Sequence, residues 1–186
     1  EEINYRRFFA VNGLAGIRAE REEVFDEVHR LLLDLVAGGI VTGVRVDHVD
    51  GLYAPTEYLQ RLSAALERAA GGRLVPIYVE KILAAGERLP DWPVTGTTGY
   101  EFAAQVDGLL LDPAAEAQLT ATYNAFTGLY EPYREVAYHG RRQVADLSFA
   151  GEINVLAIQL HGLAQRDRIH RDETLSAFRR GLRAVL

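Results

Sequence analysis

Several residue types and sequence features are absent from this chain. Its 186 residues include no cysteine, which excludes disulfides, thiolate metal sites and cysteine nucleophiles. Methionine is also absent, even at position 1, and we therefore expect the sequence to be a piece of a longer protein. No apolar run approaches the roughly 20 residues that span a bilayer, and no signal-peptide pattern is recognisable, so we expect a soluble, cytoplasmic protein.

Long blocks of charge of one sign are missing as well. The formal net charge of −6 comes from interspersed acidic and basic residues. This pattern argues against a nucleic-acid partner and against a basic patch that binds membranes, and it fits a neutral or weakly charged substrate better. What is present is 48% hydrophobic residues, enough to build a packed core.

The first half of the sequence alternates helical and strand patterns. Apolar residues recur at helical spacing over residues 21–37, and a second helical pattern over 55–70 begins with proline. Apolar, β-branched runs within residues 40–46 and 74–83 predict strands that are buried on both faces. Because helix and strand alternate across short glycine-marked turns, we expect an α/β fold with parallel βαβ units.

From residue 98 onward the strand signal ends and helical patterns follow one another. We expect helices within 98–111, 112–126, 131–147, 148–165 and 172–186. Asp112 and Asp172 are the predicted N-terminal caps, and the last helix carries a predicted buried stripe. The Pro-, Gly- and Thr-rich stretch 89–100 is the predicted hinge, so the expected domains are 1–97 and 98–186.

Charged residues follow both predicted strands. Arg45, Asp47 and His48 end the first strand, and Glu80 and Lys81 end the second. Ligands of parallel α/β sheets bind beyond the carboxyl ends of the strands. If the strands are neighbours, about 4.8 Å apart, the two carboxylates lie about 5 to 5.5 Å from one another, as in a retaining glycosidase. Arg45 stands two residues before Asp47, faces the same side and can orient its carboxylate.

Each assignment has a structural alternative. Arg45 and Asp47 also fit an ion pair at a strand end, and Glu80 with Lys81 fits a solvated terminus. The segment 47–50 holds one histidine and two aspartates without a further His or Cys cluster, which is a weak metal signal, so no metal and no cofactor is expected. Trp92 and Tyr100 fit either stacking on sugar rings or packing at a domain boundary. The remaining histidines lie in helical patterns and are expected to be structural or exposed.

Six segments, in order along the chain, resemble the maltooligosyltrehalose synthase family of the α-amylase superfamily of glycoside hydrolases. They are residues 3–9, 14–18, 47–53, 79–83, 91–102 and 172–186. The resemblance covers essentially the whole chain. It implies a partial (β/α) TIM-type barrel with an inserted, mainly helical subdomain. It also implies a maltooligosaccharide substrate, whose reducing-end α-1,4 linkage is converted to an α,α-1,1 linkage by a retaining double displacement.

The resemblance also implies roles for single residues. Asp47 would be the nucleophile, Glu80 the acid/base, Arg45 the residue that orients Asp47, and His48 a sugar contact. Further substrate-binding residues implied in the same way are Lys81, Tyr100, Tyr5, Arg6 and Arg7. Ala10 and Gly13 depart from the family pattern, which has an acidic and a polar residue there, so the behaviour of that loop is open.

Two motifs of the superfamily are not found in the sequence: the early Asn-His motif and the late motif with a second aspartate. We therefore expect an incomplete active site, an isolated chain that does not catalyse, and a need for the rest of the parent chain to complete the barrel. Unpaired strand edges would favour self-association. The alternatives are an α-amylase-like hydrolase or glucanotransferase with the same carboxylates, and a non-catalytic carbohydrate-binding or structural module.

Overall fold

The computed structural model describes residues 5–84 and 86–185 of the chain. Two compact units divide these residues. The α/β unit comprises residues 17–116, and the helical unit joins the residues up to Gly16 with those from Ala117 onward. Ile3, Asn4 and Leu186, which belong to the first and last of the resembling segments, lie outside the described residues.

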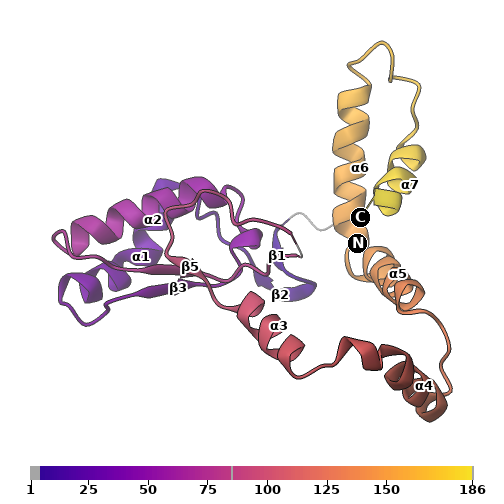
Figure 1. Ribbon diagram of the computed structural model, residues 1–186. Coiled ribbons are helices and arrows are strands. Elements are labelled where there is room, and N and C mark those ends of the chain that lie inside the picture. Colours follow the sequence, from indigo (N-terminus) through magenta and orange to yellow (C-terminus); the bar gives the residue numbers. More distant parts are fainter. Residues whose placement is uncertain (1–4, 85, 186) are drawn as a thin grey trace. The chain divides into compact units, whose positions relative to one another are not determined.

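A parallel sheet forms the centre of the α/β unit. Its described strands are β3 (Val44–Val46), β4 (Ile77–Val79) and β5 (Gly96–Thr97), in the order β3-β4-β5. Val44 pairs with Ile77 and Val46 with Val79. The helix α2 (Pro55–Ala69) connects β3 to β4, and α1 (Glu22–Ala37) packs beside α2 (Figure 1). Both strands and both helices predicted for this region are therefore present. The prediction that the strands are buried on both faces is wrong, because Tyr78 in the middle of β4 is 42% exposed.

The strand β5 lies in the stretch that was predicted to be a hinge, where the sequence analysis expected no strand. Backbone N–H groups of Thr95 and Thr98 donate to the carbonyls of Ile77 and Val79 at 2.7 and 3.0 Å, which joins this stretch to β4. A two-residue Gly-Thr strand has no alternating apolar pattern. Pairing with a neighbour, rather than its own side chains, makes it a strand.

One apolar core holds the α/β unit together. Its fully buried large side chains come from both helices, the sheet and the turn after β3: Phe25, Val36, Val49, Leu59, Leu62, Leu66 and Val79. Trp92 packs against this core, and its Nε1 donates to Thr56 Oγ1 at 3.0 Å. Of the two interpretations of Trp92, packing within the fold is therefore the one that its contacts favour.

His29 is a polar side chain inside the same core, with 8% of its surface exposed. One ring nitrogen lies 2.8 Å from the carbonyl of Phe25, and the other lies 2.9 Å from the hydroxyl of Tyr58. Its ring stacks on Phe25 at a centroid distance of 4.0 Å. Burial raises the pKa of the Tyr58 hydroxyl. His29 thus has the structural role that the sequence predicted.

Part of the apolar stripe predicted for α1 is exposed. Val28 and Leu31 lie on the surface of the helix, whereas Phe25 and Val36 are buried. The apolar residues of α1 extend over two faces of the helix, so the sequence alone predicts that both faces are buried. Within the described residues, however, α2 and the sheet cover only one of them.

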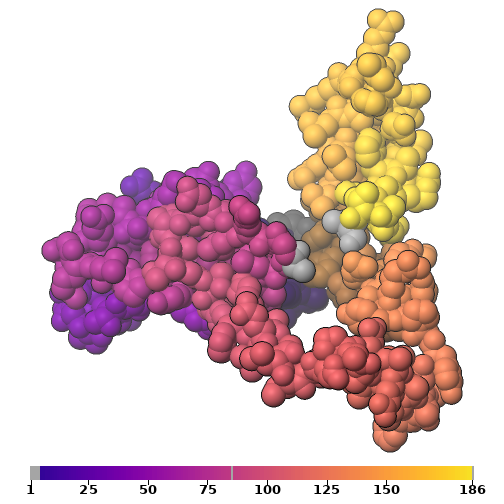
Figure 2. Space-filling model, in the orientation of Figure 1, coloured from indigo at the N-terminus to yellow at the C-terminus, as the bar shows by residue number. Residues whose placement is uncertain are grey.

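The helical unit begins with an antiparallel hairpin and continues with helices. The hairpin pairs β1 (Arg7–Phe8) with β2 (Val11–Ala15). The later elements are α4 (Glu116–Thr127), which starts at the boundary of the units, α5 (Tyr133–Gln143), the π-helix η3 (Val144–Ser148), α6 (Ala150–Ala164) and α7 (Leu175–Val185). The helix α7 packs against α6 (Figures 1 and 2).

Every helix predicted after residue 98 is present. The first of them is α3 (Tyr100–Leu109), which belongs to the α/β unit. The predicted boundary at residue 97 coincides with the end of β5, and the assignment of domains 1–97 and 98–186 stays a prediction.

One of the two predicted helix caps is confirmed. The Asp112 side chain accepts a hydrogen bond from the Ala114 N–H at 2.9 Å and caps the short 3₁₀ turn η2 (Pro113–Ala115), which leads into α4. Asp172 is not a cap, because Thr174 Oγ1 accepts from the Ala177 N–H at 3.1 Å. A capping side chain has to precede the first turn directly, and Asp172 stands three residues before Leu175.

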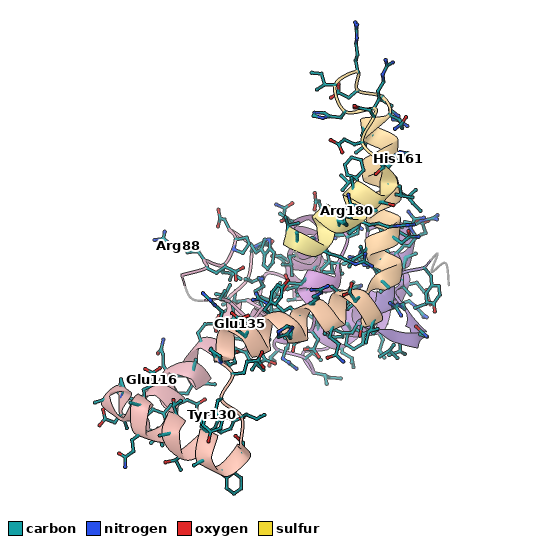
Figure 3. All side chains as sticks on the ribbon, turned by 90° about the vertical axis from the view of Figure 1, so that its right-hand side faces the viewer. Arg88, Glu116, Tyr130, Glu135, His161 and Arg180 are labelled. Carbon is teal, nitrogen blue, oxygen red and sulfur yellow. The ribbon has the colours of Figure 1, made fainter. Side chains whose placement is uncertain are left out.

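Few side chains of the helical unit are buried. Among its described residues the buried apolar ones are Ile153, Ala157 and Ala164 of α6. The predicted buried stripe of α7 is only half-buried at Leu175, and Val185 at its end is exposed. Tyr130, between α4 and α5, is 74% exposed (Figure 3). The described part of this unit therefore leaves most of its apolar surface uncovered.

None of the helices in the described ranges combines the length and the apolar character that crossing a membrane requires.

Candidate active site

Asp47 and Glu80 directly follow the neighbouring parallel strands β3 and β4. The last residues of these strands, Val46 and Val79, are paired, and the Glu80 N–H donates to the Val46 carbonyl at 2.8 Å. Parallel strands end at the same edge of a sheet, so both carboxylates leave the sheet at the edge where ligands of α/β folds bind. The predicted placement at adjacent strand ends is confirmed.

A single guanidinium group contacts both carboxylates. Arg45 approaches Asp47 Oδ1 to 2.9 Å with one terminal nitrogen and Glu80 Oε1 to 3.8 Å with the other. The contact with Asp47 follows from the strand alternation, which puts residues 45 and 47 on the same side. The contact with Glu80 arises only because β4 lies next to β3. The planar fork of arginine suits such a double contact and keeps the two acids on one side of the sheet.

Glu80 is held by two further hydrogen bonds. Its Oε2 accepts from the backbone N–H of His48 at 2.9 Å, and its Oε1 accepts from the hydroxyl of Tyr100 at 3.2 Å. Tyr100 stands at the start of α3, just after β5. The side chain of Glu80 is 27% exposed, compared with 64% for Asp47. The two acids therefore differ: Glu80 is fixed in place, while Asp47 is open to solvent.

A tight turn follows Asp47. His48 has φ 53° and ψ 49°, a left-handed conformation that is uncommon for a residue with a Cβ atom. The 3₁₀ turn η1 (Val49–Gly51) comes next, and Val49 is fully buried in the core. The His48 imidazole lies directly against Gly51, where a Cβ atom would collide with the ring. Gly51, which has no Cβ atom, thus makes room for the His48 imidazole.

The Lys81 ammonium lies between two carboxylates and is largely shielded from solvent. Its Nζ is 3.2 Å from Asp50 Oδ2 and 3.1 Å from Glu87 Oε1, and its side chain is 14% exposed. The hydrogen bond with Glu87 raises the pKa of Lys81. The Ala84 N–H and the Lys81 ammonium together hold the pKa of Glu87 below its usual range. Lys81 therefore joins the turn after β3 to the loop after β4.

The end of β5 adds polar groups that the sequence analysis did not single out. Glu101 Oε2 accepts from Thr97 Oγ1 at 3.0 Å. The other carboxylate oxygen of Glu101 and the hydroxyl of Thr98 are buried without a hydrogen-bond partner among the described residues. The missed signal was β5 itself, because a third parallel strand brings its following residues to the same edge of the sheet.

Tyr5, Arg6 and Arg7 belong to the helical unit, where the contacts recorded for them lie. The Tyr5 hydroxyl donates to the carbonyl of Asn12 at 2.9 Å, and the Arg6 carbonyl accepts from Gly16 at 2.7 Å. The side chain of Arg7 is 5% exposed and donates to Asn12 Oδ1, at 2.6 Å, and to two residues of η3 and α6. The substrate contacts expected for these three residues stay predictions.

The two partners of Arg7 beyond the hairpin are Ser148 and Glu152. Its guanidinium donates to the Ser148 carbonyl at 3.0 Å and to Glu152 Oε1 at 2.6 and 3.0 Å. These bonds fix the hairpin to the start of α6 within the helical unit.

No group of three or more His, Asp or Glu side chains within residues 5–84 and 86–185 is arranged to hold a metal ion.

The chain is similar in sequence to curated proteins of known name. No family model matches it. A protein of Mycobacterium tuberculosis (strain CDC 1551 / Oshkosh) named putative maltooligosyl trehalose synthase is 41% identical over 160 residues, which cover 86% of this chain and 19% of that protein. A protein of the same name from strain ATCC 25618 / H37Rv matches to the same extent.

Solved structures resemble the chain as well. Maltooligosyltrehalose synthase from Arthrobacter ramosus superposes with a TM-score of 0.75 at 45% identity, over 85% of this chain and 20% of that one. A hypothetical maltooligosyl trehalose synthase from Sulfolobus tokodaii gives a TM-score of 0.71 at 36% identity, over 84% and 20%. The chain therefore spans about one fifth of the length of the relatives it matches.

Proposed function

This chain belongs to the maltooligosyl trehalose synthase family and spans about a fifth of its relatives' length, and from this premise we propose that it supplies the nucleophile and the acid/base of such an enzyme. The proposed reaction converts the reducing-end α-1,4 linkage of a maltooligosaccharide to an α,α-1,1 linkage. The observation that carries the proposal is the pair of carboxylates at adjacent strand ends that share Arg45.

The two acids divide the work in this proposal. Asp47, exposed and oriented by Arg45, attacks the anomeric carbon and forms a glycosyl ester, while Glu80 gives its proton to the leaving 4-oxygen. The released glucose then turns so that its own anomeric hydroxyl faces the ester. Glu80 takes the proton of that hydroxyl as the new α,α-1,1 bond forms and Asp47 leaves. Two displacements at the same carbon retain its configuration.

Neighbouring groups hold these acids and meet the sugar. The backbone N–H of His48 and the hydroxyl of Tyr100 orient Glu80, and the imidazole of His48 is the proposed sugar contact beside Asp47. Tyr5, Arg6 and Arg7 are kept as further proposed contacts in the complete enzyme.

We propose that the α/β unit is part of a (β/α) barrel and that the helices after it form an inserted subdomain. The parallel order β3-β4-β5 supports this, because neighbouring strands of such a barrel are parallel. A complete barrel has eight strands in roughly 250 residues, so most of its strands would come from the rest of the parent chain. The rest of the parent chain would pair with the outer strands β3 and β5. Alone, the 186-residue chain would expose those edges, self-associate and fail to catalyse.

The first test uses the full-length protein that carries this chain. With maltopentaose, the unaltered protein should yield a non-reducing isomer of the same mass. Asp47→Asn should lower kcat by about 10³-fold or more and leave sugar binding largely intact, since only the attacking oxygen is lost. Asp26→Asn, an exposed change on α1, is the matched control and should leave kcat unchanged. Near-normal turnover of Asp47→Asn would rule out the nucleophile assignment.

Glu80 is tested separately. Glu80→Ala should lose most activity, and external azide should restore turnover of an activated glycosyl substrate. Azide is already an anion, so it attacks the glycosyl ester without a general base, forms a glycosyl azide and releases the Asp47 carboxylate.

One observation favours a second candidate function. Asp47 is 64% exposed in this chain, so water can reach an ester formed on it. An α-amylase-like hydrolase or glucanotransferase would use the same carboxylates but release shorter reducing sugars from maltopentaose. If neither product forms while calorimetry detects maltooligosaccharide binding, the chain belongs to a non-catalytic carbohydrate-binding module.

A further inference from the structure

Lys81 is enclosed by acidic side chains from two different loops. Asp50 belongs to the turn after β3, and Glu87 belongs to the loop after β4. Only 14% of the Lys81 side chain is exposed, compared with 60% for Asp50 and 38% for Glu87. An ammonium group with two carboxylate partners and little free surface has little room for a sugar hydroxyl. Its position suggests that it joins the two loops.

The turn that Lys81 holds has a direct connection to the carboxylate pair. Asp50 lies in η1, which begins one residue after His48 and is closed by the Gly51 N–H donating to the His48 carbonyl at 2.9 Å. The His48 N–H in turn donates to Glu80 Oε2 at 2.9 Å. A displacement of Asp50 is therefore transmitted through a single short turn to the hydrogen bond that orients Glu80.

The turn also contains a conformation that needs support. His48 is left-handed, and residues with a Cβ atom adopt this conformation only where their surroundings hold them. Val49, buried in the core, fixes one side of the turn, and the ion pair between Asp50 and Lys81 fixes its other side. Without the ammonium, the carboxylates of Asp50 and Glu87 would repel each other and push η1 away from the β4 loop.

We propose that Lys81 is a positioning residue of the active site: it holds η1 through Asp50, and thereby keeps the His48 N–H on Glu80, instead of binding the sugar. The proposal rests on the proposed function of Glu80 as acid/base. It departs from the resemblance, which implies that Lys81 contacts the substrate. A positioning residue affects the chemical step, whereas a sugar contact affects binding, so kinetics distinguish the two roles.

The kinetic experiment uses the full-length enzyme with maltopentaose. Lys81→Met should lower kcat by about 10-fold or more while KM changes less than about twofold. Adding Glu87→Gln to Lys81→Met should recover part of kcat, because the repulsion with Asp50 is removed. Arg88→Met, which removes an exposed cation from the same loop (Figure 3), is the matched control and should leave both constants unchanged.

A second readout does not depend on activity. Amide hydrogen exchange of the peptide spanning residues 44–53 should become at least about 10-fold faster at His48 in Lys81→Met, because its N–H loses Glu80 as a partner. Asp50→Asn should change kcat and exchange in the same direction by a smaller factor. This variant keeps an acceptor for the ammonium, and it tests the proposal if Lys81→Met does not fold.

The outcomes separate the two proposals. A rise in KM with unchanged kcat and unchanged His48 exchange would identify Lys81 as a sugar contact and overturn the positioning role. If the unaltered enzyme forms no non-reducing product but Lys81→Met still releases the His48 amide, the proposed function fails while the link from Lys81 to His48 stands.

Discussion

The α/β unit and the helical unit differ in how they bury apolar side chains. All of the large side chains that the structure buries completely within the described residues belong to the α/β unit. Phe25 in that unit is 1% exposed, whereas Phe126 on α4 is 90% exposed. Both are aromatic residues on helices with apolar neighbours in sequence. A βαβ arrangement closes a core around its sheet, whereas helices gain stability only when another element covers their apolar face.

The long-range links of the two units differ as well. Within the helical unit, polar groups connect distant residues: Arg7 with Glu152, Arg179 with Asn154, and Arg183 with Asp146 at 2.7 Å. In the α/β unit, apolar contacts do most of this work. Because ion pairs near the surface contribute little to stability, we expect the α/β unit to be the more stable of the two.

The largest expected effect tests this difference directly. Phe25→Ala should lower the free energy of unfolding of the α/β unit by about 4 kcal/mol, because it leaves a cavity in the core. Phe126→Ala should change stability by less than about 0.5 kcal/mol. Trp92, the single tryptophan of the chain, lies in the α/β unit, so its fluorescence in a denaturant titration reports that unit alone. An equal loss in the Trp92 transition for Phe126→Ala would show that the α/β unit depends on the helical unit, and it would contradict the comparison.

A smaller effect is expected from the buried arginine of the hairpin. Arg7→Met should destabilise the helical unit by about 2 kcal/mol, because four charge-assisted hydrogen bonds are lost. The loss is no larger because Glu152 is partly exposed, and solvent weakens its ion pair. Hydrogen exchange of α6 should accelerate, while the Trp92 transition stays in place. Arg134→Met, which removes the exposed pair with Glu135, is the control and should alter neither signal. A shift of the Trp92 transition would show that the two units unfold together.

The smallest expected effect concerns pH. Burial raises the pKa of Tyr58 above the ordinary tyrosine value of 10.0, so the folded state retains a proton that the unfolded chain loses first. The stability of the α/β unit is therefore undiminished below about pH 10 and should fall as the pH rises through the folded pKa of Tyr58. Tyr58→Phe should flatten this decline and lower stability at pH 7 by about 1 kcal/mol, since His29 loses a partner. The decline is measured by denaturant titrations at several pH values with Trp92 fluorescence. If stability falls equally steeply at alkaline pH in Tyr58→Phe, the decline does not come from Tyr58.

Much of the candidate site could be predicted from short patterns. Asp47 and Glu80 each end an apolar, β-branched run, and this position is readable because strand and loop differ in composition. The contact of Arg45 with Asp47 follows from alternation along one strand. The contacts of Glu80 with His48 and Tyr100 could not be read in this way, since they join residues 32 and 20 positions apart, respectively, through strand pairing. Asp50, the partner of Lys81 from the turn after β3, was missed for the same reason.

The sequence by itself determined the elements: two strands, the helices around them, the cap at Asp112 and the ends of the strands where the acids stand. These features follow from local periodicity and local hydrogen bonding, which a short window of residues contains. Only the tertiary structure decided that Gly96 and Thr97 form a strand, that Val28 and Leu31 stay exposed, and that one guanidinium serves two carboxylates. Each of these three features depends on which other element packs against the residue. A short window of sequence does not contain that information, because strand pairing and burial involve residues that are distant along the chain.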